Sequence, residues 1–394
     1  MKNKIVKLIP VLLFSLLLTG CWDNVEIDRK AFVSTIGIDV GADIEHKNEL
    51  IGSQNENSDI KGNYKEFNIL QVTYGFPDIR NMEKQNGSAE ELSITVNGYS
   101  MTDTYFKALA KSSRSLHFGH SKLLLLSEEL FKYPTLIQEI TDYIQREPNL
   151  NRTIIMAVVK GKSKDYIQLK PTMEANIDSY ITALMGNSSK NGVVSPVTLT
   201  KYIDMIKTYN AGVLPVFSLK GEDDIELTGV AIIEDSSIKD YLNNNQVTDI
   251  QILKGDIGSC RKSINENGHP VDYYIKSVNT DLDISYENNK LHLNYKVDAE
   301  GSLKGYYTDS EVLDSDAINK IEEEFNISME KELEETYRFV IDELNIDLLQ
   351  VGSNVRRYHR GIWKEVEDNW MEVLNDAEIS ISVNNNIRTV GISN

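Results

Sequence analysis

Two histidines lie three positions apart, a spacing at which both imidazoles could reach one metal ion. His117 and His120 stand in the sequence His-Phe-Gly-His, shortly before four consecutive leucines. A zinc site needs further thiolate, imidazole or carboxylate ligands, and none lies close to this pair in the sequence. The alternative is a turn that precedes a buried strand. We therefore predict no metal site here, and no cofactor elsewhere in the chain.

An acidic segment in the C-terminal third is the second candidate, because carboxylates bind calcium. Calcium needs oxygens folded around one point, usually with a glycine in the turn. These residues instead fall along one predicted helix, a pattern that favours a solvated face. They are Glu322, Glu323, Glu324, Glu330, Glu332, Glu334 and Glu335. The motifs of nucleotide-binding loops, serine hydrolases and zinc proteases are also absent from the sequence, so we predict that the chain is not an enzyme.

The third candidate is a cysteine that follows an N-terminal apolar segment. Three lysines precede Leu8–Leu18, an uncharged segment that is too short for a membrane span of ~20 residues. The next residues complete Leu18-Thr19-Gly20-Cys21, which resembles a bacterial lipobox. In a lipobox the signal is cut before the cysteine, whose thiol takes a diacylglyceryl group. The alternative is a plain signal peptide with an accidental cysteine.

Lipid on Cys21 would make a durable membrane anchor, because two acyl chains bury many methylenes. No later apolar stretch approaches ~18 residues, so we predict a globular body tethered to the outer face of a cytoplasmic membrane. The chain has two cysteines, and lipidation would leave Cys260 as a free thiol with no disulfide partner. Arg261 could lower the pKa of that thiol, but we interpret Cys260 as a spectator.

The charge of the chain argues against one class of partner and indicates another. The 394 residues carry 41 Lys and Arg against 60 Asp and Glu, a net charge of −19. Such an acidic chain is a poor candidate for nucleic acid, which binds through phosphate neutralisation. Arg356, Arg357, His359 and Arg360 form a basic island in this background. The island could dock phospholipid head groups or an acidic partner, or it could balance the charge of the glutamate-rich helix.

Hydrophobic patterns predict an α/β arrangement before residue 206. Phe32–Val40, Phe67–Tyr74 and Leu92–Tyr99 have strand composition. A helix from Thr102, a strand over Ser121–Ser127, a helix after Pro134 and a strand over Thr153–Val159 then follow in turn. This alternation predicts parallel strands. Residues 1–20 are the predicted signal peptide, and 21–205 the predicted N-terminal α/β domain.

We predict a small middle domain over residues 206–270 and an α+β domain over 271–394. The middle domain combines two strands, Val213–Leu219 and Leu227–Ile233, with short helices at Ile238–Leu242 and Asp249–Leu253.

After residue 270, alternating apolar residues around Glu287–Lys290 predict an antiparallel hairpin with one wet face. Apolar residues at intervals of three and four predict a long helix from Asp314 or Asp316. Trp363, Val366 and Trp370 suggest a shorter helix, and two strands around Asn384-Asn385-Asn386 close the chain. The predicted fold class is therefore α+β and multi-domain: a mixed α/β N-terminal part, then an antiparallel sheet with a long helix.

A series of short motifs also runs through the mature chain. It begins with Cys21-Trp22-Asp23 and Ile36-Gly37-Ile38-Asp39, and continues with Gly119-His120-Ser121-Lys122. Tyr143-Ile144-Gln145-Arg146-Glu147-Pro148 and Ile362-Trp363-Lys364 follow. In order and spacing these motifs resemble the GerAC-type spore germination lipoproteins, also called the Ger(x)C family. The resemblance covers nearly the whole mature chain.

This resemblance implies a non-enzymatic lipoprotein subunit of a nutrient germinant receptor, in three domains of unusual fold. It implies two integral membrane subunits as partners, a place in the inner membrane of the spore, and nutrients such as amino acids or sugars as signals. The functional residue it transfers is the lipidated Cys21. The alternatives are a lipid-anchored solute-binding protein of a transporter, which should have two similar α/β lobes, and a tethered hydrolase, which should have a nucleophile motif.

Overall fold

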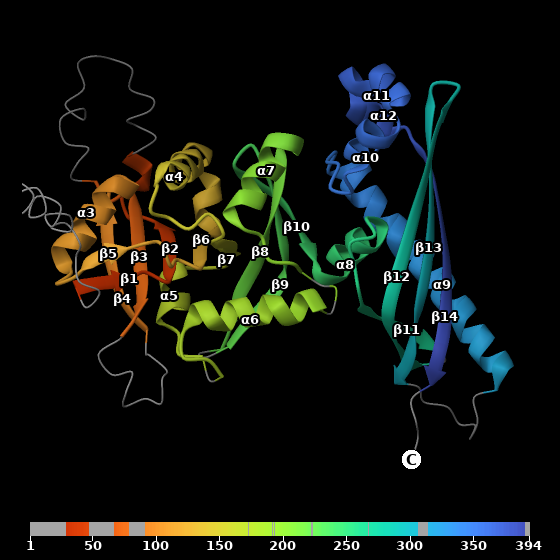
Figure 1. Cartoon of the computed structure of the whole chain (residues 1–394), viewed down its shortest axis with the longest axis horizontal. Helices are drawn as coiled ribbons and strands as arrows, with labels where there is room; N and C mark the ends of the chain where they lie inside the picture. Colours follow the sequence, from red (N-terminus) through yellow and green to blue (C-terminus); the bar gives the residue numbers. More distant parts are fainter. Residues whose placement is uncertain are drawn as a thin grey trace, which may run out of the picture.

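The computed structural model describes residues 29–46, 67–78, 91–171, 173–190, 192, 194–221, 224–266, 268–305 and 314–390. Within these ranges the strands form an eight-stranded sheet, a four-stranded sheet and a two-stranded pair. The two larger sheets lie side by side along the long axis of the molecule (Figure 1). We call the part built on the eight-stranded sheet the large lobe, and residues 260–390 the C-terminal lobe.

The large lobe is a mixed sheet with a parallel centre. Strands β2, β6, β7 and β8 run parallel, and antiparallel strands flank them on both sides. In spatial order the strands are β10 (Ser237–Asn243), β9 (Asp224–Glu234), β8 (Ala211–Lys220), β7 (Ile155–Val159), β6 (Leu123–Ser127), β2 (Thr35–Val40), β3 (Leu70–Pro77) and β4 (Glu91–Gly98). A short parallel pair, β1 (Lys30–Phe32) and β5 (Ser115–His117), lies beside them. The predicted parallel element is confirmed.

The four leucines of β6 explain why helices cover both faces of this sheet. Successive side chains of a strand point to opposite faces, so Leu124 and Leu126 pack with one set of helices, and Leu123 and Leu125 with another. The first set is α3 (Met101–Lys111), α4 (Pro134–Arg146) and α7 (Leu199–Tyr209). The second set is α5 (Ser163–Gln168) and α6 (Ile177–Lys190). A 3-10 turn, η5 (Glu128–Lys132), follows β6.

One predicted helix of the middle region is wrong. Ile238–Leu242 belongs to β10, which pairs antiparallel with β9. The two strands are joined at Asp235 and Ser236, which both have positive φ, 49° and 64°. Two such residues match a tight hairpin turn that suits the twist of the flanking strands. Strands β8 to β10 therefore extend the sheet of the predicted 21–205 domain, and the boundaries at residues 205 and 270 stay predictions.

The C-terminal lobe packs one long helix on a four-stranded sheet. Its strands are, in order, β11 (Cys260–Glu266), β12 (His269–Glu287), β13 (Lys290–Gly305) and β14 (Glu378–Val390). The predicted hairpin is confirmed as β12 and β13, with positive φ at Asn288 and Asn289. The helix is α9 (Ser315–Arg338), capped by the carboxylate of Asp314 and continued by a π-helical turn, η6 (Phe339–Glu343). Its predicted apolar stripe is buried on the sheet from Ile321 to Leu344, whereas Ile318 in the first turn is only partly buried.

Strand β14 differs from the sequence-based expectation in two ways. It is one strand where two were predicted, and it pairs parallel with β13. Asn384-Asn385-Asn386 forms no turn because the chain is held extended there: Asn385 is buried, and its N–H donates to Asn326 Oδ1 of α9 at 2.8 Å. Three short helices and a 3-10 turn precede β14 at the top of Figure 1: α10 (Val351–Tyr358), α11 (Arg360–Val366), η7 (Glu367–Asn369) and α12 (Trp370–Asn375).

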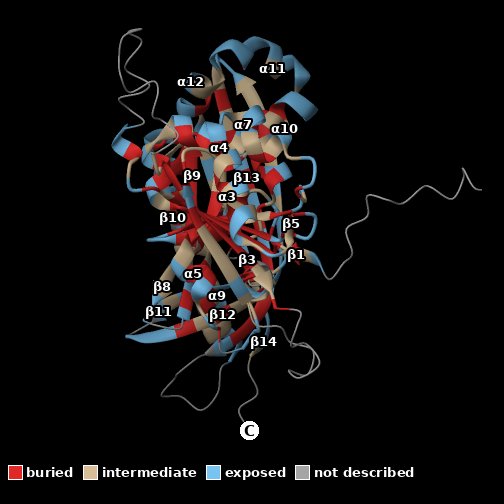
Figure 2. Ribbon diagram, turned by 90° about the vertical axis from the view of Figure 1, so that its left-hand side faces the viewer, coloured by how far each residue is buried: buried red, intermediate tan, exposed pale blue. Residues whose placement is uncertain are grey.

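The described fold is α+β with a mixed N-terminal sheet and a helix-covered C-terminal sheet, as predicted. Figure 2 shows the buried residues gathered along the strands, whereas α11 is mostly exposed. The two lobes meet at α8 (Asn244–Leu253), which follows β10 and also packs against α9.

Candidate functional site

A cavity of about 330 Å³ lies where the two lobes meet. The large lobe contributes α7, α8 and strands β8 to β10, and the C-terminal lobe contributes Asp347, Leu348 and Gln350. Beside it, the hydroxyls of Tyr209 on α7 and Ser353 on α10 are 2.9 Å apart and join the lobes. Most of the lining is aliphatic, with Val213, Val230 and Ile250 as examples. The cavity can therefore hold a small molecule that contacts both lobes at once.

The charged groups of this cavity fall into two sets. Asp347 is buried, and its carboxylate accepts hydrogen bonds from the N–H groups of Val351 and Gly352 and from Trp370 Nε1, at 2.9, 2.7 and 3.3 Å. Burial raises the pKa of Asp347, and these donors oppose the shift. The second set, at the exposed end of the cavity, consists of Lys201, Lys254 and Asp256.

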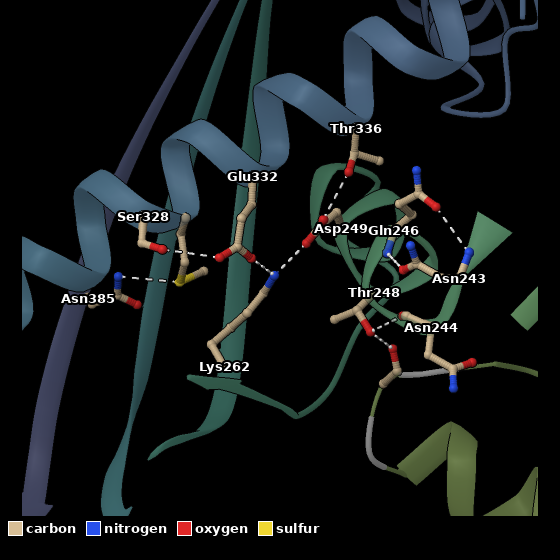
Figure 3. A network of polar contacts seen from close by, with 12 residues as sticks. Asn243, Asn244, Gln246, Thr248, Asp249, Lys262, Ser328, Glu332, Thr336 and Asn385 are labelled. Carbon is tan, nitrogen blue, oxygen red and sulfur yellow. Dashed lines mark hydrogen bonds and ion pairs between the residues drawn. The ribbon is translucent and has the colours of Figure 1, made fainter. Parts of the chain in front are cut away.

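A buried ion cluster fixes α8 against the C-terminal lobe. Lys262 Nζ of β11 lies 2.6 Å from Asp249 Oδ1 of α8 and 2.6 Å from Glu332 Oε2 of α9. Thr336 donates a hydrogen bond of 2.9 Å to the other oxygen of Asp249. Figure 3 shows Lys262 between the two carboxylates. Burial lowers the pKa of Lys262, but Asp249 and Glu332 outweigh this effect and raise the pKa overall.

Three members of the predicted basic island, Arg356, Arg357 and Arg360, line an open groove of about 600 Å³ on α10 and α11, whereas His359 lies between the two helices and does not line it. Arg356, Arg357, Arg360 and Lys364 are all exposed along it, and Glu367 is its acidic member. None of these four basic side chains has an ion pair with another residue in the described part of the chain. Arginine guanidinium groups match carboxylates and phosphates in shape and charge, so the groove suits an anionic partner.

The groove is held in shape by packing beneath it. Trp363 lines the groove and packs against Trp370, with ring centroids 5.5 Å apart. Trp370 in turn donates its indole N–H to Asp347, whose carboxylate also accepts hydrogen bonds from the first two N–H groups of α10, those of Val351 and Gly352. The arginines therefore project from a helix pair whose orientation is fixed by buried contacts.

The acidic residues predicted to form a solvated face are only partly solvated. Glu330, Asn326 and Glu322 lie four residues apart on α9 and accept hydrogen bonds from alternate N–H groups of β14, at 2.9, 2.8 and 2.6 Å. The β14 donors are Val383, Asn385 and Ile387. These contacts satisfy the outer edge of the sheet, which would otherwise be open to strand pairing. The sequence pattern shows which residues share a helix face, but not that a strand edge lies beside it.

The histidine pair lies in an aromatic contact. The rings of His117 and His120 are 5.7 Å apart, and both pack edge-on against Phe32. Burial lowers the pKa of His117, and the charge of Lys30 adds to this shift. Among the described residues, no group of three or more His, Cys, Asp or Glu side chains could hold a metal ion.

Of the two cysteines, the structure describes Cys260 but not Cys21. Cys260 is buried in β11, and burial raises the pKa of its thiol to about 11, which disfavours the reactive thiolate. Cys21 and the predicted lipobox lie outside the described residues, so lipidation stays a prediction. Within the described ranges, no helix is long and apolar enough to cross a membrane.

Two family descriptions match consecutive parts of the chain. Residues 23–219 match the "Spore germination protein N-terminal domain", and residues 228–391 match "Spore germination B3/ GerAC like, C-terminal". The chain belongs to the GerAC family. The predicted family resemblance is thereby confirmed, and the chain is a spore germination protein of the Ger(x)C type.

Individual relatives agree with this assignment along the whole chain. "Spore germination protein YndF" of Bacillus subtilis (strain 168) is 22% identical over 410 residues, which covers 99% of this chain and 99% of that protein. "Spore germination protein KC" of the same organism is 22% identical and covers 100% of this chain and 98% of its own. The crystal structure of the GerBC protein has a similar fold, with a TM-score of 0.57, 16% sequence identity and coverage of 81% and 93% of the two chains.

Proposed function

We propose that this GerAC-family chain is a lipid-anchored, non-enzymatic subunit of a nutrient germinant receptor. The observation that carries the proposal is the extent of the family match, which runs from residue 23 to residue 391 and leaves only the predicted signal and lipobox before it. Cys21 carries the lipid and holds the body on the outer face of the spore inner membrane. Integral membrane subunits of the receptor are its partners there.

The surfaces of the chain support an interaction role. The basic groove offers four exposed cations to an anionic group, in a chain with a net charge of −19. The alternative, a solute-binding protein of a transporter, is expected to have two similar lobes. Here one lobe has an eight-stranded sheet covered on both faces, and the other has four strands and one long helix. This difference between the lobes favours the receptor subunit.

The anchor is tested by replacing each cysteine in turn. Cells that express the full chain are fed an alkyne fatty acid. The label on the purified protein is measured, and so is the share of the protein that is recovered with the membranes. Cys21→Ala is expected to lose the label and leave the membrane fraction. Cys260→Ala is the matched control, and it should keep both because its buried thiol is not a lipidation site. Equal labelling of Cys21→Ala and the wild type would contradict the anchor.

The receptor assignment has its own test. Spore membranes solubilised in mild detergent are used to capture the tagged full chain, and the captured proteins are identified by mass spectrometry. Multi-spanning membrane proteins encoded beside this chain are the expected partners. Recovery of a permease with an ATPase in their place would support the transporter alternative and contradict the proposal.

A further inference from the structure

The cavity between the lobes has an apolar body and a charged entrance. Val213 and Val230 come from the strands of the large lobe, Ile250 from α8, and Leu348 from the C-terminal lobe. Its volume, about 330 Å³, falls within the range of small-molecule sites, which is roughly 300–1,000 Å³. The uncharged polar residues of the lining are Ser195, Tyr209, Gln251 and Gln350. The aliphatic majority favours an apolar group over a polyhydroxylated one such as a sugar.

The entrance carries an excess of positive charge. Lys254 forms an ion pair of 3.3 Å with Asp256, whereas Lys201 has no ion pair with any residue that the structure describes. Partial burial lowers the pKa of Lys201, and the nearby charge of Lys254 adds to this shift, while Asp256 opposes it. An ammonium group in this position is stabilised when an anion binds beside it.

The remaining charged group of the lining is already satisfied. The carboxylate of Asp347 accepts three hydrogen bonds, from Val351, Gly352 and Trp370. These donors all belong to the C-terminal lobe, so this carboxylate is stabilised within its own lobe. Lys201 is left as the charged group that a ligand can pair with, at the exposed end of an apolar chamber.

We propose that this cavity binds a small carboxylate with an apolar tail, the carboxylate on Lys201 and the tail between the lobes. This goes beyond the anchoring and receptor role, because it assigns a ligand site to the chain itself. The ligand touches α7 and α8 on one side and Leu348 and Gln350 on the other. Its binding therefore favours the arrangement in which the lobes enclose it.

The test measures binding to the purified full chain in mild detergent by saturation-transfer NMR, with protein-free detergent as the blank. The probe is isocaproate, and isohexanol serves as its uncharged counterpart with the same tail. Isocaproate should bind with a Kd below about 5 mM, and isohexanol at least about tenfold more weakly. A Kd of isocaproate above about 5 mM, or equal affinity for the two probes, would overturn the proposal.

Three variants locate the site. Lys201→Met removes the charge and keeps the length of the side chain, so isocaproate affinity should fall by at least about tenfold. Lys207→Met lies on the same helix outside the cavity and should bind as the wild type does. Val213→Phe fills the chamber and should abolish binding of both probes.

Circular dichroism and a melting curve establish that each variant is folded. If Val213→Phe does not fold, the Lys201 and Lys207 variants decide the question alone. Unchanged affinity in folded Lys201→Met would show that the cavity is not the site. These measurements need no receptor and no lipid on Cys21, so their failure leaves the proposed function standing, and the reverse also holds.

Discussion

The buried cluster at Lys262 and the groove on α10 and α11 both contain positive charges, but these charges are paired within the chain in the first and exposed to solvent in the second. Lys262 lies between two carboxylates of its own chain and joins two lobes, at 7% side-chain exposure. The groove arginines project into solvent, with no ion-pair partner among the described residues. In an acidic chain, a cation that is satisfied internally stabilises the structure, whereas one that is left unpaired is available to a partner.

The largest effect is expected at Lys262. Lys262→Met leaves Asp249 buried without its cation, so the free energy of unfolding should fall by about 3–5 kcal/mol. Adding Asp249→Leu removes the stranded charge and should recover much of that loss. Urea unfolding of the two variants measures both values. A loss below about 1 kcal/mol in the single variant would mean that the cluster does not hold the lobes together.

Glu91 sharpens the comparison because it is a largely buried carboxylate that forms no ion pair with any residue in the described part of the chain. Burial raises its pKa from 4.5 to about 7, while a hydrogen bond of 2.9 Å from the N–H of Ile177 partly opposes the shift. A raised pKa in the folded state stabilises the protein below pH 4.5, and this contribution is lost as the pH rises through 7.

The stability difference between wild type and Glu91→Gln should therefore fall by on the order of 3 kcal/mol between pH 4.5 and 7. Other buried carboxylates titrate in both proteins and cancel in this difference. Glu129→Gln, at an exposed position, is the control for the loss of a surface carboxylate. Denaturant titrations at several pH values measure the difference. A difference that stays constant with pH for Glu91→Gln would show that the pKa of Glu91 is not raised in the folded protein.

The contacts between α9 and the edge of β14 predict a smaller effect. Asn326→Ala leaves the N–H of Asn385 without its acceptor and should cost about 1–3 kcal/mol. Glu323→Ala, on the exposed side of the same helix, should change stability by less than about 0.5 kcal/mol. Thermal melting of both variants tests the contrast. Equal losses would show that the edge contact contributes nothing specific.

Local patterns predicted the parts of the fold that depend on near neighbours. The four leucines of β6 indicated a strand buried on both faces, and the stripe on α9 indicated a long helix on a sheet. The prediction for the middle region failed because the pattern there is weak. Apolar and polar residues alternate only loosely over Ser237–Asn243, and the turn at Asp235-Ser236 lacks glycine. The parallel pairing of β14 with β13 depends on a long connection that no local pattern reports.

The sites divide in the same way. The arginines of the basic island could be found from sequence because they are neighbours on two consecutive helices. The cavity could not, because its lining comes from residues between 194 and 350 that only the fold brings together. The acidic partners of Lys262 were also missed, since Asp249 and Glu332 lie 13 and 70 residues away from it.

The central claim is that the unpaired cations of the groove serve a partner, and germination of spores tests it most directly. In the triple variant Arg356→Glu, Arg357→Glu and Arg360→Glu, stability should change by less than about 0.5 kcal/mol per site, because the side chains are exposed. The control, Lys132→Glu with Lys207→Glu and Lys276→Glu, makes the same change in net charge away from the groove. With equal amounts of protein in the spores, nutrient-triggered germination should slow severalfold in the groove variant and not in the control. Wild-type germination of the groove variant would contradict the account.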